Sequence, residues 1–301
     1  METPGALSTR ARRRNSLGRV RHASFCVAVL LALQARAPLL WCQEPDDPVS
    51  TNSKAADKPI PGSDHEDLAK KLQNPFADLI TFPLQNITSL GVGPDDGSGN
   101  VLNLQPVVPL HLDDDWNLLA RPILPVSYTS VPDNEFGLGD LNLEPFLSPR
   151  RPGRVEWGVG VIVGIPTATG TYLGTGKWTA GPSFAVFAVR GHWTFSMIAN
   201  QQWSYAGDGA RDPVSLLQLQ PSLSYILRHG WLLVCGPLIS ADWTEPGGQK
   251  WAVPVGGGVG RVFSVGKQRM SLQLEAYANP IRPDDGPRSL ILLTGTFLFP
   301  R

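Results

Sequence analysis

The sequence is poor in cysteine, in long apolar runs and in net charge, and each shortage excludes a class of protein. Only 3 of its 301 residues are cysteine, which excludes a secreted scaffold stapled by disulfides. The longest apolar run, "ASFCVAVLLAL", is too short to cross a bilayer as a helix, and no stretch of 18 apolar residues follows. A transmembrane helix is therefore not expected. Hydrophobic residues at 42% and charged residues at 17% are nevertheless typical of a chain with a folded core.

Charge is balanced overall but unevenly distributed. Residues 1–37 hold seven arginines against the single acid Glu2, so the rest of the chain has 19 basic and 25 acidic residues, a net charge of −6. A mildly acidic chain offers no electrostatic reason to bind nucleic acid. We therefore expect no nucleic-acid partner.

The N-terminus has the order of a secretory signal peptide, with a basic start, the apolar run and then "QARAPLLWC". We assign residues 1–42 to this signal, with a cleavage site between 37 and 45. Ala35-Arg36-Ala37 satisfies the small-residue rule, and a cut near Cys42 is the alternative. The motif "LLWC" resembles a lipoprotein box, but Trp41 is too large for the position before the cysteine, which disfavours lipidation.

Two short segments precede the main domain. Residues 43–65 are polar and rich in proline, which predicts a disordered periplasmic linker. Residues 66–82 place Leu68 and Leu72 on one helix face, and the apolar pattern continues past Asn74-Pro75. This pattern predicts a short amphipathic helix.

From residue 83 to residue 300 the apolar pattern has a period of two, which indicates β-strands. The stretch "WTFSMIANQQWSY" (193–205) separates Trp193, Trp203 and Tyr205 from a face of Thr, Ser, Asn and Gln. Counting such runs predicts about twelve strands: 83–93, 101–111, 116–128, 136–147, 155–165, 177–188, 193–205, 214–227, 231–243, 250–263, 270–279 and 288–299. Connections between them are mostly short and long in alternation, as in transmembrane barrels, although "SPRRPGR" breaks the rule.

Alternation alone does not say which face is inside, since a secreted soluble β-protein has the same stripes with opposite polarity. Three features favour a membrane barrel. The runs match the 9 to 11 tilted residues that cross a bilayer, aromatic residues stand at strand ends, and charged residues such as Arg121 would be costly on a lipid-facing wall. The predicted fold is therefore all-β: a transmembrane, antiparallel, up-and-down β-barrel of about twelve strands.

Two sets of side chains are candidates for function. The polar face should line the lumen, and its candidates are Asn103, Gln105, Arg121, Asp140, Asn142, Glu144, Gln202, Gln218, Gln220, Gln273 and Glu275. The aromatic residues expected at the membrane interface are Trp116, Tyr128, Trp193, Trp203, Tyr205, Trp231, Trp243, Trp251, Phe297 and Phe299. Arg121 with Asp140 and Glu144 could form a charged constriction or could simply brace the wall.

Several phrases together resemble one bacterial outer-membrane family. They are "LAKKLQNPFADLITFPLQN", "LNLQPVVPL", "DWNLLARPILPV", "FGLGDLN", "GIPTATGTYLGTGKWTAGP", "ANQQWSYAG" and "WAVPVGGGVGRVF", in order over residues 66–300. The family is labelled putative MetA-pathway of phenol degradation, and its members are often called transporters or "neuromedin U". The resemblance implies a Gram-negative outer-membrane β-barrel associated with hydrophobic or aromatic compounds, and it supplies no catalytic residues.

The remaining motifs favour structural interpretations. "GGGVG" (256–260) lacks the third spaced glycine and the helix of a phosphate loop, so close packing or a strand bend is expected. "DDDW" (113–116) lacks the spacing of a calcium-binding EF-hand loop, so a solvated turn is predicted there. His192 and Ser196 share a face, but His192 falls in a predicted turn, which disfavours a catalytic pair. We therefore expect neither catalytic residues nor a cofactor or metal.

The sequence thus predicts a protein of the cell outer membrane, exported by its signal peptide. The leading hypothesis is a channel or transporter that passes small solutes by passive diffusion through a polar lumen, with the 66–82 helix as a periplasmic plug. A structural or adhesion-type barrel with a filled lumen is the alternative, and a barrel enzyme is a weaker one. The expected partners are outer-membrane lipid, the barrel-insertion machinery and periplasmic chaperones, and a small-molecule solute. The terminal run "LILLTGTFLFPR" resembles the signal that this machinery recognises, although it ends in Pro300-Arg301.

Overall fold

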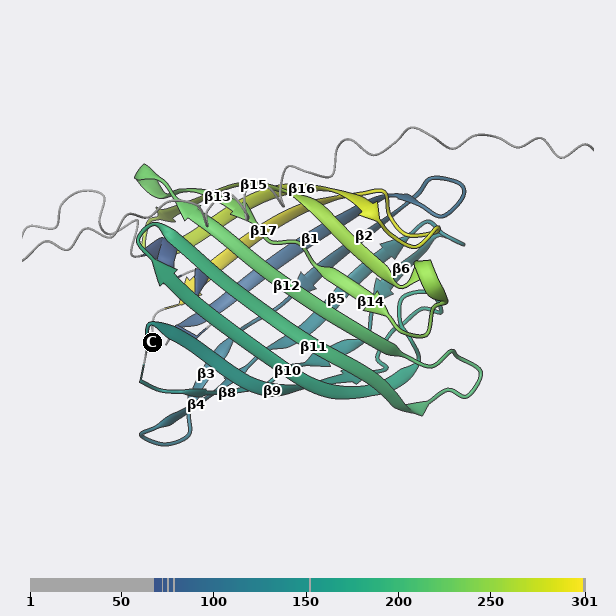
Figure 1. Ribbon diagram of the computed structural model, residues 1–301, viewed down its shortest axis with the longest axis horizontal. Helices are drawn as coiled ribbons and strands as arrows, with labels where there is room; N and C mark the ends of the chain where they lie inside the picture. The colour runs from purple at the N-terminus through teal and green to yellow at the C-terminus, as the bar shows by residue number, and fades with distance from the viewer. Residues whose placement is uncertain (1–67, 72, 75, 78, 152, 300–301) are drawn as a thin grey trace, which may run out of the picture. The chain divides into compact units, whose positions relative to one another are not determined.

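A computed structural model describes residues 68–71, 73–74, 76–77, 79–151 and 153–299, which form one antiparallel sheet closed into a barrel (Figure 1). The expected signal peptide (1–42) and linker (43–65) lie outside the described residues. The strands are β1 (Ile80–Val92), β2 (Gly97–Leu104), β3 (Val108–His111), β4 (Trp116–Ala120), β5 (Pro122–Thr129), β6 (Glu135–Leu138), β7 (Leu141–Leu143), β8 (Phe146–Pro149), β9 (Val155–Ile165), β10 (Lys177–Arg190), β11 (Trp193–Gly207), β12 (Ser215–Ile226), β13 (Trp231–Cys235), β14 (Ile239–Asp242), β15 (Trp251–Val265), β16 (Gln268–Ile281) and β17 (Ser289–Phe299). Two 3₁₀ turns, η2 (Arg228–Gly230) and η3 (Gly247–Gln249), lie in connections.

The 17 strands of the described sheet make twelve crossings of the wall. Each of the groups β2–β3, β4–β5 and β13–β14 is one crossing with one break, the group β6–β8 is one crossing with two breaks, and the other eight strands are continuous. β1 pairs with β17 from Ile80 opposite Phe299 to Leu90 opposite Ser289, which closes the ring. A closed ring leaves no unpaired strand edge. The predicted twelve-stranded antiparallel barrel is confirmed, with β1 beginning three residues earlier than expected.

Each broken crossing has a proline at one of its breaks. Pro106, Pro122, Pro145 and Pro237 lie in or directly beside breaks between short strands. Proline has no backbone N–H and cannot donate to a strand ladder, which favours a break at these positions, although Pro83, Pro182 and Pro221 are paired inside continuous strands.

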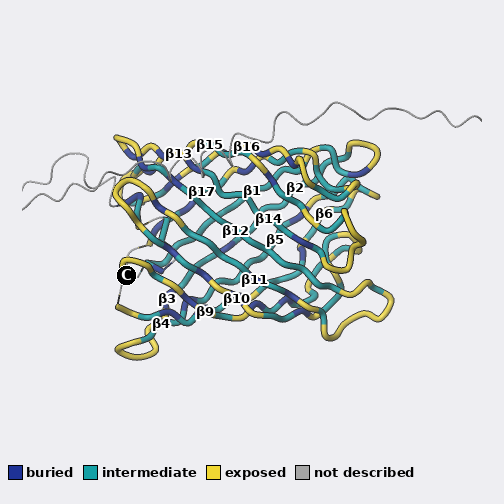
Figure 2. Tube along the Cα trace, viewed as in Figure 1, coloured by how far each residue is buried: buried dark blue, intermediate teal, exposed yellow. Residues whose placement is uncertain are grey.

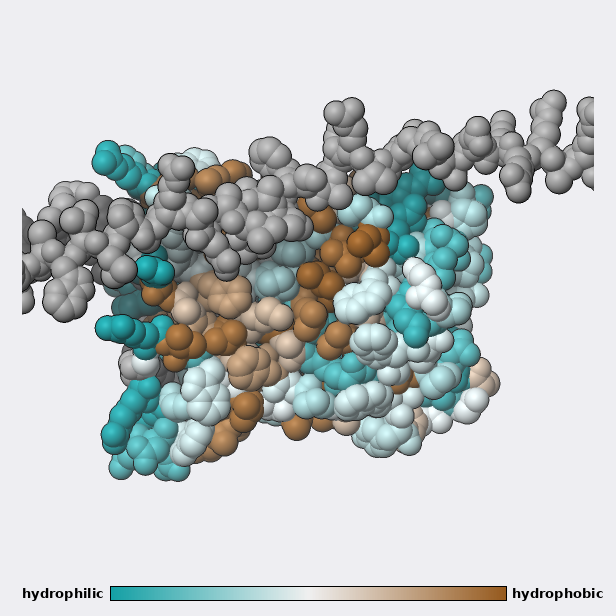
Figure 3. Space-filling model, viewed as in Figure 1, coloured by the Kyte–Doolittle hydropathy of each residue, from teal (hydrophilic) through white to brown (hydrophobic). Residues whose placement is uncertain are grey.

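The outer wall is apolar and the inner wall is largely polar, as the alternation predicts. Along β11, Trp203 and Tyr205 are exposed on the outside, whereas Thr194, Asn200 and Gln202 are buried inside. Along β9, exposed valines alternate with residues that face inward. Figure 3 shows the resulting hydrophobic surface across the middle of the wall, between hydrophilic ends.

The connections differ between the two ends of the barrel. The short-turn end carries the turns 112–115, 150–154, 191–192, 227–230 and 266–267. The long-loop end carries 93–96, 130–134, 166–176, 208–214, 243–250 and 282–288. Exposed residues concentrate in these connections, whereas the wall itself is mostly intermediate or buried (Figure 2).

Inside the short-turn end the wall carries two apolar clusters, which the period-two pattern did not predict. The described residues between 68 and 79 (68–71, 73–74, 76–77 and 79), here called the N-terminal segment, cover this region. Leu68 and Ala69 are buried in one cluster with Ile226, Leu232, Val262 and Leu298. Phe76 is buried in another, with Leu119, Phe146, Ala185 and Phe187. These inward-facing apolar side chains are therefore shielded from water by the chain's own segment.

Only part of the predicted 66–82 helix lies in described residues: 68–71 and 73 have helical backbone, and β1 begins at Ile80. No helix in the described part of the chain is long and apolar enough to cross a membrane.

Candidate functional site

The candidate site is a row of polar side chains halfway through the lumen. Gln105, Arg121 and Glu144 each stand at a break in a crossing, and each is followed by a proline. Because the breaks fall on three neighbouring crossings, the three side chains meet inside the barrel.

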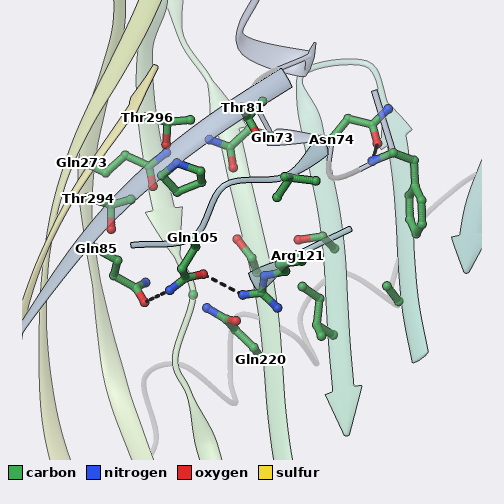
Figure 4. Close-up of a pocket in the computed structure, with 18 of the residues that line it drawn as sticks. Gln73, Asn74, Thr81, Gln85, Gln105, Arg121, Gln220, Gln273, Thr294 and Thr296 are labelled. Carbon is green, nitrogen blue, oxygen red and sulfur yellow. Dashed lines mark hydrogen bonds between the residues drawn. The ribbon is translucent and has the colours of Figure 1, made fainter. Parts of the chain in front are cut away.

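A chain of hydrogen bonds links these residues. Arg121 donates from Nη1 to Glu144 Oε2 over 2.6 Å and from Nη2 to Gln105 Oε1 over 2.8 Å. The Gln105 amide in turn donates to Gln85 Oε1 over 3.3 Å. Figure 4 shows Gln85, Gln105 and Arg121 in this row, with Gln220 beside them.

Glu144 is the buried anchor of the row, with 0% of its side chain exposed against 14% for Arg121. Its Oε1 accepts from Ser183 Oγ over 2.5 Å and from Asn200 Nδ2 over 3.1 Å. A buried carboxylate is tolerated only when it is paired and hydrogen-bonded, and these three donors meet that need. The pair with Arg121 carries no net charge, so the row presents mainly hydrogen-bonding groups to the lumen.

The backbone position of Glu144 depends on a glycine in the next strand. A Cβ atom on Gly160 of β9 would lie 2.0 Å from the carbonyl oxygen of Pro145. Only a residue without a side chain fits there, so Gly160 leaves room for the backbone at the 144–145 break to lie against β9.

The row separates two cavities. One, of about 210 Å³, lies toward the N-terminal segment, and the other, of about 170 Å³, is lined by Asn103, Asn142 and Gln218. Gln85, Gln105, Arg121 and Gln220 line both cavities, together with Ile198 and Gly236. We call these four polar side chains the constriction. The second cavity also contains the buried acceptor Asn200 Oδ1, which has no hydrogen-bond partner among the described residues.

The N-terminal segment closes the first cavity toward the short-turn end. Asn74 and Phe76 line this cavity and also a third one of about 410 Å³, which reaches His111 and Arg150 at the short-turn end. Asn74 Nδ2 donates to Glu156 Oε1 over 3.0 Å, and Ser224 Oγ donates to Gln73 Oε1 over 3.3 Å. These contacts and the Phe76 cluster hold the segment across the lumen.

A second polar cluster lies on another part of the inner wall. Tyr277 donates its hydroxyl to Glu275 Oε2, and the Gly236 N–H points at both groups, 2.7 Å from the tyrosine oxygen. This cluster fills the break between β13 and β14, so it replaces the ladder bonds that Pro237 interrupts.

The structure brings most of the predicted lumen residues to the two central cavities. The residues that line them are Asn103, Gln105, Arg121, Asn142, Glu144, Gln218, Gln220, Gln273 and Glu275. Gln202 is buried elsewhere in the wall and accepts a hydrogen bond from Thr179 Oγ1 over 2.7 Å.

The expected meeting of Asp140 with Arg121 is wrong. Asp140 lies at the break between β6 and β7, and its carboxylate accepts hydrogen bonds from Ala168 N, Thr175 N and Thr175 Oγ1. Glu135 binds the same 166–176 loop through Thr171 N and Tyr172 N. Asp140 therefore holds the 166–176 loop in place. The backbone N–H groups of that loop donate to its carboxylate, whereas the guanidinium of Arg121 does not.

The predicted interface aromatics occupy both ends of the outer wall. Trp116 meets Trp157 with ring centroids 6.3 Å apart and Trp193 meets Tyr225 at 4.7 Å, both at the short-turn end. Trp243 meets Trp251 at 5.8 Å at the long-loop end. Tyr128, Trp203 and Tyr205 are also exposed at the long-loop end, and Trp231, Phe297 and Phe299 at the short-turn end are at least partly exposed. Their contact with lipid stays a prediction.

Sequence reasoning missed Gln85 and Ser183 and left Asn200 outside the site. A usable signal was present: a polar residue followed by proline in the middle of a strand run, as in Gln105-Pro106, Arg121-Pro122 and Glu144-Pro145. In these three cases the first residue of the pair stands at a break and enters the lumen, whereas Gln220-Pro221 lies within continuous β12.

The structural interpretations of the other motifs agree with the contacts. A Cβ atom on Gly258 would lie 1.9 Å from Leu274 O, so this glycine of "GGGVG" permits close strand packing. Asp113 accepts hydrogen bonds from Asp115 N and Trp116 N, as expected for a turn. His192 lies in a turn with its ring 5.9 Å from Tyr225, whereas Ser196 lines the first cavity.

Comparison with known proteins gives a family and a fold. The model of the family described as "Putative MetA-pathway of phenol degradation" matches residues 81–234. No curated protein matches the sequence.

Among solved structures, the COG4313 outer membrane channel from Pseudomonas putida F1 is similar at 18% identity, with a TM-score of 0.55 over 73% of this chain and 95% of that chain. The NanC porin aligns at 8% identity (TM-score 0.46; 73% and 100% covered). The outer membrane phospholipase of Salmonella typhi aligns at 17% identity (TM-score 0.39; 77% and 97% covered).

Proposed function

The chain belongs to the family described as "Putative MetA-pathway of phenol degradation", and from that premise we propose that it is an outer-membrane channel for small solutes. The constriction is the observation that carries this proposal. Four polar side chains face two cavities in sequence along the lumen, which is the arrangement of a filter on a path. The solute would pass by diffusion, with no catalytic step.

The chemistry of the first cavity favours solutes that are partly apolar. One wall consists of Phe76, Leu119, Phe146 and Ile198, whereas the opposite wall carries glutamine and threonine side chains. A dry apolar cavity of about 150 Å³ holds a molecule the size of benzene. A cavity of about 210 Å³ therefore has room for one aromatic ring with a hydrogen-bonding substituent. The reference to phenol in the family description agrees with this class of solute.

The constriction would select by hydrogen bonding more than by charge. Arg121 is neutralised by Glu144, and its neighbours Gln85, Gln105 and Gln220 are uncharged amides. Amides offer both donors and acceptors, so they can replace part of the water around a hydroxyl group.

The outer membrane is the proposed location. The apolar outer wall, the aromatic residues at both ends and the family membership support it. Lipid, the barrel-insertion machinery and periplasmic chaperones are the proposed partners, with the terminal Phe297 and Phe299 as the recognised signal. In this orientation the short-turn end faces the periplasm, so the N-terminal segment is a periplasmic plug.

Ion selectivity in a planar bilayer tests the constriction. In Glu144→Gln the charge of Arg121 becomes uncompensated, so selectivity should shift toward anions. In Arg121→Gln the charge of Glu144 becomes uncompensated, so selectivity should shift toward cations. A unit charge 4 Å from an ion contributes about 1 kcal/mol in water, which corresponds to roughly a fivefold change in partitioning.

Arg261→Gln is the matched control. Arg261 lies on the outer wall, with its guanidinium 5.3 Å from the ring of Trp231, so its replacement should leave selectivity unchanged. Shifts in the same direction for both lumen variants, or no shift in either, would show that ions do not pass this row. Phenol can then be compared with benzene as a blocker of the current, and the amphipathic cavity predicts the stronger block by phenol.

A further inference from the structure

A polar cluster lies on the outer wall of the barrel, where the surface is otherwise apolar. Gln85 and Ile87 of β1 line the lumen, so Asn86 and Thr88 between and beyond them point outward. On β2, Asn103 lines the lumen, so Asn100 points outward as well. Thr88 and Asn100 stand directly opposite each other in the β1–β2 ladder.

The three side chains form hydrogen bonds with one another. Asn86 Nδ2 donates to Asn100 Oδ1 over 2.9 Å. Asn100 Nδ2 donates to Asn86 Oδ1 over 3.0 Å and to Thr88 Oγ1 over 2.9 Å. Thr88 Oγ1 also donates to Asn86 Oδ1 over 3.4 Å.

These bonds leave one amide donor and one amide lone pair over. Each amide carries two N–H donors and a carbonyl oxygen with two lone pairs. The second N–H of Asn86 and the second lone pair of Asn100 Oδ1 have no hydrogen-bond partner among the described residues. The patch thus offers a donor and an acceptor side by side.

The depth of the cluster makes these leftover groups costly in lipid. Asn86 lies six residues from either end of β1 (Ile80–Val92), whereas Asn100 stands directly opposite Tyr128, an exposed aromatic residue of the long-loop end. Asn86 is two residues deeper along the sheet than this pair and stands opposite Leu102 and Leu293, so its spare N–H faces hydrocarbon, which offers no hydrogen-bond partner. Gln201, another outward amide, is different because it accepts from Trp243 Nε1 over 2.9 Å, near the long-loop end.

The surroundings of the cluster permit close approach. On the neighbouring strand β17, a Cβ atom added to Gly295 would meet no other atom within 4 Å. Leu102 and Leu293 are the ladder neighbours of Asn86, and Leu84 precedes it by two residues on β1. Transmembrane helices associate through small residues that allow close approach and polar side chains that bond across the interface, and this face of the barrel has both.

We propose that this face, formed by Asn86, Thr88, Asn100 and Gly295, is where two copies of the chain meet in the membrane. A twofold axis through the patch brings the spare N–H of Asn86 in each copy to the spare oxygen of Asn100 in the other. A symmetric dimer requires such a self-complementary patch, and this one contains both halves. The inference concerns the outer wall and does not depend on what passes through the lumen.

Cysteine cross-linking in isolated outer membranes tests the proposal. Leu102→Cys is introduced into a background in which Cys26, Cys42 and Cys235 are replaced by serine, and mild oxidation should produce a disulfide-linked species of twice the monomer mass. Ala199→Cys is the matched control, because it faces outward halfway along β11 on the opposite side of the ring. It should stay monomeric.

The double variant Asn86→Leu/Asn100→Leu separates the polar contact from chance proximity. Both amides are removed together, so neither is left without its hydrogen-bond partner. Heat-modifiable migration reports whether the barrel is folded. Loss of the Leu102→Cys cross-link in this folded variant supports the proposal. The proposal is overturned by a cross-link that survives, by equal cross-linking at position 199, or by a product containing a different protein. A monomer mass for the wild-type protein extracted in mild detergent also overturns it.

Discussion

Replacing Phe76 tests whether the N-terminal segment closes the lumen. The Phe76 side chain is only 8% exposed and packs among Leu119, Phe146 and Phe187 from three different crossings. Truncation of a buried phenylalanine to alanine costs about 3–5 kcal/mol, because apolar contacts are lost and a cavity remains. Taking about 3 kcal/mol for this short segment, the ratio of docked to undocked segment should fall roughly 100-fold, at 1.4 kcal/mol per tenfold.

The consequence should be visible in single-channel recordings. Phe76 stands between the cavity of about 210 Å³ and that of about 410 Å³ at the short-turn end. We therefore expect Phe76→Ala to spend more time in a conducting state than the wild-type protein. Glu156→Gln should act in the same direction but more weakly, because it weakens the single hydrogen bond to Asn74.

Phe184→Ala controls for the loss of a ring as such. Phe184 lies on β10 like Phe187 but is 42% exposed on the outer wall. Its replacement should leave the open time unchanged. Equal open times for Phe76→Ala and Phe184→Ala, in folded protein, would refute the idea that the segment blocks the path.

Two further substitutions test how the wall supports the site. Gly160→Ala places a methyl group against Pro145 O, so we expect the free energy of unfolding to fall by about 1–3 kcal/mol. The midpoint of heat-modifiable unfolding should fall with it. Gly209→Ala is the control, because its Cβ would meet no atom within 4 Å, and it should leave the midpoint unchanged. Asp140→Ala removes three hydrogen bonds to the 166–176 loop, so chymotrypsin should cut after the exposed Tyr172 faster than in the wild-type protein. The control Asp113→Ala, which alters a turn at the other end, should not change that rate, and an unchanged rate in Asp140→Ala would show that Asp140 does not hold the loop.

The crossings and their inner and outer faces could be predicted from sequence because both depend on local pattern. The period of two in 193–205 is enough to place Trp203 outside and Gln202 inside, since neighbouring side chains on a strand point to opposite faces. Gln201 interrupts the apolar face in the sequence, and the structure supplies the reason: its amide oxygen binds the indole N–H of Trp243. That pairing joins two crossings, so no local pattern could have indicated it.

The contacts of the site were less predictable because they join crossings that are distant in sequence. Asp140 and Glu144 lie on the same predicted run and look equivalent as acids. The breaks at 139–140 and 144–145 separate them, so Asp140 binds a loop while Glu144 meets Arg121, Ser183 and Asn200. Parity along a regular strand does not apply across a break, and this is why the predicted Arg121–Asp140 contact was wrong.

The same breaks explain the position of one side of the row, formed by Gln105, Arg121 and Glu144. A regular strand holds its side chains at the wall, so a barrel of twelve uninterrupted crossings would place any polar ring at its circumference. Prolines at 106, 122 and 145 interrupt three neighbouring crossings, and Gly160 leaves room for Pro145 behind the last of them. The backbone can then move inward on this side, carrying Gln105, Arg121 and Glu144 toward the lumen. Replacing any of these prolines would restore a backbone N–H to the wall, so we expect a wider path, measured as a larger single-channel conductance in a planar bilayer.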